Sequence, residues 1–322
     1  KTDYDKSRIE GKNLSYITLD PFKTSLKDIY SFFKLIFSLD KDDIIFSWLY
    51  ISDIIASLIK CLLFWKKFKV FWNVRNTIIK KREYSFLTSL SFFLSKNLFM
   101  RIPNRIIFNS YKSMEDHIKE GYLKEKSITI HNGYERLSNI SIPKKNKNIF
   151  KIAYVARYHP QKNHKLLFKS ISLYKKKYSK NFELYLAGSG INQENIILIK
   201  ELEELNIYND VKLLGLVNQK SIHELFSKCD ITLLLSQYGE GFPNVIAEAM
   251  LYGTFPIATD IGESKLLLDK FGKIIPPNAD EELISSLINE FAIFKYNSFE
   301  EWKLMVKDCQ NFSKNRFSII RI

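Results

Sequence analysis

The sequence has few of the residues that build disulfides and structural metal sites. Its 322 residues include only three cysteines, Cys61, Cys229 and Cys309, which lie far apart and show no Cys-x-x-Cys or Cys/His spacing. This usage is typical of reduced thiols in a cytosolic protein and argues against a structural metal ion. The sequence also lacks a recognisable secretory signal and any internal repeat of short period.

No uninterrupted apolar run could serve as a membrane span. Residues 44–65 are long enough, but Asp53 and Lys60 interrupt them, and either charge would be costly at the centre of a lone span. We therefore divide this segment into a strand at 44–47 and a helix at 52–63.

Acidic residues are scarce in one half of the chain only. Residues 1–150 hold 27 Lys and Arg against 15 Asp and Glu, a net charge of +12, whereas residues 151–322 hold 22 against 20, a net charge of +2. A basic half suggests nucleic acid, an anionic membrane surface or a polyphosphate-linked substrate as partner. No recognised nucleic-acid-binding module accompanies the charge, so we expect no nucleic-acid partner. A solvated lysine surface is the alternative.

Length and composition indicate two globular domains. A chain of 322 residues exceeds one ordinary hydrophobic core, and 46% hydrophobic residues are ample for packing. In the first half we expect further strands at 68–73 and 105–109, a helix through His117 and a strand ending at Ile130. Residues 84–100 alternate Phe and Leu with Ser and Thr, which indicates an amphipathic helix, either buried or lying on a membrane interface.

The second half alternates strands and helices. Short apolar runs, typical of buried parallel strands, are separated by segments with helical spacing. This order predicts a doubly wound parallel sheet whose ligands lie beyond the carboxyl ends of the strands. The expected strands are 152–156, 183–187, 211–215, 231–235, 256–259 and 273–275, and the expected helices cover about 163–177, 194–205, 220–228, 243–252 and 280–294. A polar run at 143–148 separates the two halves, and a last helix is expected at 299–312.

One segment, 236–250 (SQYGEGFPNVIAEAM), is the most informative. It follows a buried strand and joins a glycine loop to a helix whose first turn carries no acid, which leaves backbone N–H groups open to an anion. Glu240 and Glu248 bracket that anion site. A carboxylate beside a phosphate is unfavourable unless it accepts hydrogen bonds, for example from sugar hydroxyls. The combination suggests a nucleotide-sugar site.

Two cations lie on the loop after the strand at 152–156. Arg157 and Lys162 could neutralise a diphosphate and stabilise the negative charge that grows on it as a sugar departs. That role would make a divalent metal unnecessary, and the second half contains no Asp-x-Asp motif. We expect His159 and His164, which flank the cations, to be surface residues rather than catalysts.

Five segments in order resemble the retaining glycosyltransferases with the GT-B fold, family four (group 1) type, of bacterial surface-polysaccharide biosynthesis. They are 151–163 (KIAYVARYHPQKN), 186–190 (LAGSG), 211–215 (VKLLG), 236–250 and 259–263 (TDIGE). The resemblance covers about half of the chain, from residue 130 to 278.

The resemblance implies two Rossmann-like, doubly wound parallel-sheet domains facing across a cleft. Residues 1–143 would bind the acceptor, 144–150 would be the linker, 151–296 would bind the donor, and 297–322 would form a helix that crosses back to the first domain. The acceptor domain is expected to be incomplete at its amino end, because nothing before residues 15–19 resembles the strand and glycine-rich loop with which relatives begin.

The resemblance also implies roles for single residues. Arg157, Lys162 and Glu240 would be catalytic, with Glu240 on the transferred sugar, and Glu248 would accept the ribose hydroxyls. Further contacts to the nucleotide sugar would come from Gly241, Phe242, Pro243, Asn244 and Val245, mainly through backbone N–H groups, and from Val217 beside the base. On the acceptor side the candidates are Arg75, Asn76 and Ser110, although relatives carry a donor-contacting His near Arg75. Asn132 also matches a family position near the cleft.

The function that the resemblance implies is transfer of a hexose or N-acetylhexosamine, with retention, from a nucleotide sugar. A UDP-sugar is the expected donor, the acceptor would be a glycan or a polyprenyl-diphosphate-linked glycan, and neither a cofactor nor a metal is expected. We expect a cytoplasmic enzyme, peripheral on the inner face of the cytoplasmic membrane. The alternatives are a non-catalytic nucleotide-sugar-binding remnant and a sugar-nucleotide 2-epimerase, which would need acid/base groups that the first half does not offer.

Overall fold

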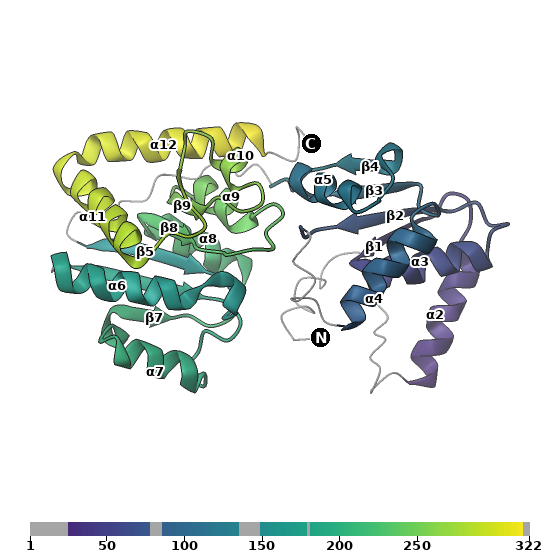
Figure 1. Ribbon diagram of the computed structural model, residues 1–322, viewed down its shortest axis with the longest axis horizontal. Helices are drawn as coiled ribbons and strands as arrows, with labels where there is room; N and C mark the ends of the chain where they lie inside the picture. The colour runs from purple at the N-terminus through teal and green to yellow at the C-terminus, as the bar shows by residue number, and fades with distance from the viewer. Residues whose placement is uncertain (1–24, 78–85, 135–148, 179–180, 318–322) are drawn as a thin grey trace. The chain divides into compact units, whose positions relative to one another are not determined.

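The computed structural model describes residues 25–77, 86–134, 149–178 and 181–317. Two compact units make up the chain (Figure 1). The first consists of residues 1–74, 81–107 and 118–128, and the second of residues 75–80, 108–117 and 129–322. The polar run 143–148 and the segment 15–19 lie outside the described residues, and Phe150, the last residue of the expected linker 144–150, begins β5.

The first unit is built on a four-stranded sheet in the order β1-β2-β3-β4, whose last two strands extend to the boundary of the second unit. Val70, Trp72 and Val74 alternate along β2 and are buried, which is the pattern of a strand that packs one face on a core. The strands are β1 (Ile44–Trp48), β2 (Lys69–Val74), β3 (Arg105–Phe108) and β4 (Ser127–Thr129). The helices that accompany them are α2 (Leu26–Ser38), α3 (Tyr50–Leu62), α4 (Phe86–Leu94), a π-helical turn (Ser95–Phe99), α5 (Tyr111–Lys119) and a 3-10 turn (Lys124–Lys126).

Asp53 explains why residues 44–65 fold as a strand and a helix. Asp53 lies in the first turn of α3, is fully buried, and accepts a hydrogen bond from the Ser47 hydroxyl of β1 at 2.5 Å. Ser57, one turn further along α3, accepts a hydrogen bond from the indole N–H of Trp72 at 3.2 Å. Burial raises the pKa of Asp53 to about 7. Throughout the part of the chain that the structure describes, no helix has the length and apolarity needed to cross a bilayer.

The amphipathic helix expected at 84–100 is present as α4 and the π-helical turn that follows it. Its apolar side chains are divided between the two alternative environments, and Phe92 packs against the rings of Tyr50 and Tyr122. Ser91 and Ser95 are the residues that are buried in these two elements, whereas large apolar side chains are exposed. Those exposed side chains are Phe86, Leu87, Leu90, Phe93 and Leu98.

The second unit contains a six-stranded parallel sheet in the order β10-β9-β8-β5-β6-β7, as the alternating pattern predicts. Its strands are β5 (Phe150–Val155), β6 (Phe182–Ala187), β7 (Val211–Leu213), β8 (Ile231–Leu234), β9 (Phe255–Thr259) and β10 (Lys273–Ile275). Its helices are α6 (His164–Tyr178), α7 (Ile196–Glu204), α8 (Gln219–Lys228), α9 (Asn244–Leu251), α10 (Ser264–Leu268), α11 (Glu281–Asn297) and α12 (Phe299–Arg316), with 3-10 turns at Pro160–Lys162 and Tyr208–Asp210.

The last helix, expected at 299–312, packs along the second unit against α9 (Figure 1). The Gln310 amide donates to the Leu251 carbonyl at 2.9 Å, and the Ser313 hydroxyl donates to the Ala247 carbonyl at 3.1 Å. Trp302 is fully buried. These contacts make α12 part of the support for α9, which carries part of the candidate site.

Candidate functional site

The topology of the second sheet brings two loops together. β5 pairs with β6 on one side and with β8 on the other, so the order of the strands reverses at β5. Loops at the carboxyl ends of strands on the two sides of such a switch point diverge and leave a crevice for a ligand. Here those loops are 156–163, after β5, and 235–243, after β8.

The loop after β5 is rigidly held. It contains the 3-10 helix Pro160–Lys162, whose first turn is capped by the His159 ring: Nδ1 accepts the Gln161 N–H at 3.2 Å. The hydroxyl of Tyr154, which lies on β5, donates to the Lys162 carbonyl. Gly188, with a φ of 146°, packs so closely that a Cβ there would lie 2.2 Å from the Ala156 carbonyl oxygen. The backbone that presents Arg157 is therefore fixed by its neighbours.

The loop after β8 is held from the other side by residues 259–263. The Thr259 hydroxyl donates to the Ser236 carbonyl at 2.7 Å, and the Glu263 N–H donates to the Gly241 carbonyl at 3.0 Å. A Cβ on Gly262, which has a φ of 62°, would lie 2.3 Å from the Glu240 carbonyl oxygen. Only a glycine fits this close approach.

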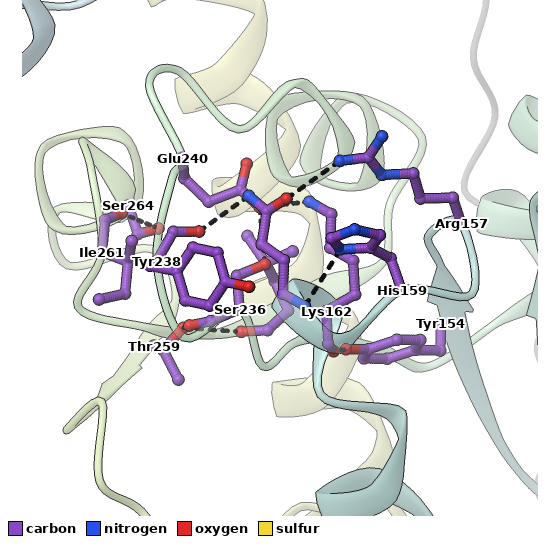
Figure 2. A network of polar contacts seen from close by, with 12 residues as sticks. Tyr154, Arg157, His159, Lys162, Ser236, Tyr238, Glu240, Thr259, Ile261 and Ser264 are labelled. Carbon is purple, nitrogen blue, oxygen red and sulfur yellow. Dashed lines mark hydrogen bonds and ion pairs between the residues drawn. The ribbon is translucent and has the colours of Figure 1, made fainter. Parts of the chain in front are cut away.

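The two loops meet in a network of polar side chains (Figure 2). The Lys162 ammonium forms an ion pair with Oε1 of Glu240, and the Ser236 hydroxyl donates to the same oxygen at 2.6 Å. The Lys162 and Glu240 side chains retain 17% and 12% of their exposure, so water screens the pair only partly.

Gln161 ties Arg157 to the other loop. Its Oε1 accepts a hydrogen bond from Arg157 Nη2 at 3.2 Å, and its Nε2 donates to the Tyr238 carbonyl at 2.8 Å. The Gln161 carbonyl accepts the Gln237 N–H at 3.0 Å. Gln161 is 8% exposed, so this amide is a buried link between the two loops.

The structure thus brings Arg157, Lys162 and Glu240, three of the residues singled out from the sequence, into one network. Two members of that network, Gln161 and Ser236, were missed. Gln161 lies within segment 151–163, and Ser236 lies within segment 236–250. Nothing in the spacing of these residues distinguishes a side chain that points inward from one that is solvated.

The start of α9 is open in the way that an anion site requires. Pro243 is the N-cap residue, no side chain caps the helix, and its first turn holds no acid. The Asn244 side chain has another use, because its Oδ1 accepts hydrogen bonds from Asn132 at 2.6 Å and from the Tyr134 hydroxyl at 3.0 Å. Pro243 has no N–H, so the backbone N–H groups of Asn244 and Val245 are the ones that could face a ligand here.

The other residues expected at the donor site differ in their surroundings. The Phe242 side chain is 5% exposed and packs with the rings of His131 and Phe317, so its side chain belongs to the core and only its backbone could serve a ligand. Val217 and Val245 pack against the same hydrophobic cluster on the β5 side of α9.

Glu248 lies on α9, half-buried, near Tyr134. Burial and the Glu248 carboxylate together raise the pKa of the Tyr134 hydroxyl. The Glu248 side chain therefore lies close to the Tyr134 hydroxyl.

The residues expected on the acceptor side are mostly occupied by local structure. The fully buried Ser110 hydroxyl accepts the Ser113 N–H at 3.0 Å at the start of α5, and the Ser113 hydroxyl donates to the Asn76 carbonyl at 2.6 Å. The Arg75 side chain is exposed, and its carbonyl accepts a hydrogen bond from Asn109 at 3.5 Å.

The expectation that His164 is a surface residue was wrong. It is 4% exposed, and its ring lies 5.1 Å from the rings of both Tyr154 and Tyr158. Burial, with the Lys162 charge, lowers the pKa of His164 to about 4. His159 is exposed, as expected, and its pKa is lowered by partial burial and by the charges of Arg157 and Lys162.

Within the described ranges, no group of three or more His, Cys, Asp or Glu side chains is placed to hold a metal ion. Of the three cysteines, Cys61 is exposed, and Cys229 and Cys309 are buried.

Comparison with known proteins identifies relatives of this fold and site. The family model described as "Glycosyl transferases group 1" matches residues 135–311. The chain is 23% identical over 299 residues to the uncharacterized glycosyltransferase MJ1069 of Methanocaldococcus jannaschii, covering 89% of this chain and 74% of that protein. It is 37% identical over 109 residues to the putative glycosyltransferase EpsF of Bacillus subtilis, covering 34% of this chain and 27% of that protein.

Among solved structures, that of Anabaena HepE in complex with UDP and glucose is similar, with a TM-score of 0.74 and 20% identity over 89% of this chain and 77% of that one. This likeness, together with the two parallel sheets, confirms the predicted GT-B fold.

Proposed function

Because the chain belongs to the group 1 glycosyltransferases, we propose that it transfers a hexose or N-acetylhexosamine from a nucleotide sugar, with retention, to a glycan or a polyprenyl-diphosphate-linked glycan. The observation that carries this proposal is the network of Arg157, Lys162 and Glu240 at the switch point of the second sheet. Cations next to a carboxylate suit a ligand that has both phosphates and hydroxyls. Synthesis of a surface polysaccharide such as capsule or O-antigen is the process in which we place the reaction.

The proposed donor is a UDP-sugar. Arg157, Lys162 and the open start of α9 would hold the diphosphate, as charge-assisted hydrogen bonds and helix N-termini do elsewhere. Glu248 would accept the ribose hydroxyls, and Val217 would lie beside the base. The structure of HepE with UDP and glucose supports the choice of nucleotide.

In the proposed reaction the bond between the anomeric carbon and the leaving phosphate oxygen breaks, and the acceptor oxygen bonds to the same face of that carbon. The proton of the acceptor hydroxyl passes to the leaving phosphate. Arg157 and Lys162 would stabilise the charge that develops on that phosphate, and Glu240 would hold the sugar hydroxyls in place. In this scheme the protein supplies positioning and charge, and needs neither a strong base nor a divalent metal.

The experiment that tests the proposal is incubation of the protein with UDP-glucose, UDP-N-acetylglucosamine or GDP-mannose, with and without membrane-extracted polyprenyl-linked glycans. Release of the nucleoside diphosphate with labelling of the acceptor would support it. Binding without release of nucleotide would favour the non-catalytic remnant, and appearance of the epimeric nucleotide sugar would favour the 2-epimerase.

The two carboxylates can be separated in the same assay. Glu240→Gln should reduce transfer without weakening binding of the nucleotide alone, because its proposed partner is the sugar. Glu248→Ala should weaken binding of the nucleotide itself, because its proposed partner is the ribose. The opposite pattern would mean that the two roles are exchanged.

A location on the inner face of the cytoplasmic membrane is the remaining part of the proposal. The basic first half would meet anionic lipid there, next to a lipid-linked acceptor. The exposed apolar side chains of α2 and α4 support this location.

A further inference from the structure

The ion pair between Lys162 and Glu240 is anchored at the carboxylate by a side chain and at the lysine through its backbone. The fully buried Ser236 holds Oε1 of Glu240 at 2.6 Å, and the Tyr154 hydroxyl holds the Lys162 carbonyl. With 17% and 12% of the two side chains exposed, neither charge is well solvated. Each group therefore depends on the other, because a partly buried charge that loses its partner is strongly disfavoured.

A donor diphosphate would compete with the Glu240 carboxylate for the Lys162 ammonium. We propose that Lys162 exchanges Glu240 for the donor diphosphate, and that Glu240 thereby becomes a specificity-determining residue that favours the nucleotide sugar over the free nucleoside diphosphate. This inference rests on the proposed function.

The exchange discriminates because the two ligands leave Glu240 in different states. A free nucleoside diphosphate gives Lys162 a new partner but leaves the Glu240 carboxylate with Ser236 alone. A nucleotide sugar offers phosphate oxygens to Lys162 and hydroxyl donors to Glu240, so every charged group is satisfied again. The pair therefore opposes binding of the product more than binding of the substrate, and it assists release of the nucleoside diphosphate after transfer.

Two further charged side chains of this unit have partners of their own. Arg157, on the loop after β5, donates to Gln161 at 3.2 Å, and Glu201, on α7, accepts a hydrogen bond from the Tyr158 hydroxyl at 3.0 Å. Glu201 is thus a matched control, because its removal takes one negative charge from the same unit without removing the partner of Lys162.

The rival arrangement is a bridge in which Lys162 contacts Glu240 and the phosphate together. In that case Glu240 would orient Lys162 for the ligand, and its removal would weaken binding of the nucleoside diphosphate. The two arrangements predict opposite signs for one measurement.

That measurement is calorimetric titration of the wild type, Glu240→Gln, Lys162→Met, the double variant and Glu201→Gln with UDP and GDP. We expect Glu240→Gln to bind the preferred nucleotide about tenfold more tightly than the wild type, an effect between those of exposed and buried ion pairs. The gain should vanish in the double variant, and Glu201→Gln should change the affinity by less than about twofold.

A second titration, with the UDP-sugar or GDP-sugar, tests whether the effect of Glu240 depends on the sugar. In Glu240→Gln the ratio of the affinity for the nucleotide sugar to the affinity for the free nucleotide should fall. A general loosening of the loop would weaken the binding of both ligands and would not tighten that of the free nucleotide. Melting temperatures report whether the variants fold, and Glu240→Ala replaces Glu240→Gln if the latter does not. Unchanged or weaker nucleotide binding by a folded Glu240 variant would overturn the exchange alone. A wild type that binds neither UDP nor GDP would overturn the proposed function, and the exchange with it.

Discussion

At the scale of single residues, the candidate site depends on side chains whose partners are other side chains. Arg157 is exposed, yet Gln161 fixes its guanidinium from a buried position and reaches the loop after β8 with its other amide atom. A guanidinium held in this way has less freedom to lose when it binds a diphosphate. Gln161 is therefore best described as a positioning residue that acts through Arg157.

If Gln161 acts through Arg157, substitution of Gln161 should weaken nucleotide binding less than substitution of Arg157. Arg157→Ala should weaken UDP binding by about 1.5–3 kcal/mol, as expected for a charged hydrogen bond, and Gln161→Ala by roughly 0.5–1.5 kcal/mol. Calorimetry gives both values, with Gln193→Ala, whose amide oxygen accepts from Tyr208 at 3.0 Å, as the control. If the effects of Arg157→Ala and Gln161→Ala were additive in the double variant, Gln161 would not act through Arg157.

Asp53 gives a prediction of stability against pH. Burial raises its pKa from 3.8 to about 7 in the folded chain. The folded state then holds a proton that the unfolded state has lost, so this group's contribution to stability is full below pH 3.8 and is lost as pH rises to about 7.

Asp53→Asn should remove that pH dependence, since an amide keeps the acceptor for Ser47 and does not ionise. In urea denaturation the variant should match the wild type near pH 4 and exceed it at pH 8, by roughly 2–4 kcal/mol. Parallel pH profiles of the two proteins would show that Asp53 titrates normally.

Much of the candidate site could be predicted at this scale, but only where a residue's role follows from its place in the chain. Arg157 and Glu240 stand on loops that directly follow buried strands, and parallel strands carry such loops to one edge of a sheet. Gln161 turns inward because a short 3-10 helix places it there. His164 begins α6 but is enclosed by two tyrosines from β5 and its loop. Neither environment has a signature in sequence spacing.

At the scale of elements, the strands of the second sheet were the easiest to predict, because buried parallel strands are continuous apolar runs. Residues 231–235 predicted β8 (Ile231–Leu234) in this way. Two helices were missed. α10 (Ser264–Leu268) is too short to show a period. α2 (Leu26–Ser38) packs no side chain into the core, although Leu26, Ile29, Tyr30, Phe33 and Phe37 recur at helical spacing. That spacing and the Ser25/Asp28 capping box were available signals for α2.

A buried ion pair joins several elements at the amino end of the second sheet. Lys295 of α11 donates to Asp230 and to the Ile149 carbonyl, each at 2.9 Å, and Asp230 also accepts the Lys151 N–H at 2.8 Å. The side chains of the pair are each 1% exposed. Such a pair gives little net stability over apolar residues, but the loss of one partner leaves a buried charge.

Lys295→Met should therefore destabilise the chain by about 3–5 kcal/mol, and Asp230→Asn combined with Lys295→Met should recover part of that loss. Urea denaturation measures both. Lys177→Met is the control, because its ion pair with Glu282 is exposed and should leave the midpoint unchanged. Equal midpoints for Lys295→Met and Lys177→Met would contradict the account of the buried pair.

At the scale of the whole molecule, the uneven charge remains to be explained by function. Residues 1–150 carry a net charge of +12, against +2 for the remainder. In the same half, α2 buries none of its side chains, and Leu26, Tyr30, Phe33 and Phe37 are exposed on it. Large exposed apolar side chains among lysines suit the interface of an anionic membrane, where aromatic rings enter the headgroup region and lysines face the lipid phosphates.

Flotation with liposomes tests this attachment. Binding to anionic vesicles should be strong at 0.1 M salt and lost at 1 M, because the Debye length falls from about 10 Å to about 3 Å. Each well-placed Lys or Arg contributes on the order of 1 kcal/mol near such a surface, so a few suffice for reversible attachment. Phe33→Glu on α2 should reduce flotation, whereas Ile197→Glu on α7, at a side chain that is also exposed, should not. Equal partitioning to neutral and anionic vesicles, unchanged by salt and by Phe33→Glu, would leave the charge as a solvated surface, and a soluble glycan would then be the better acceptor to test.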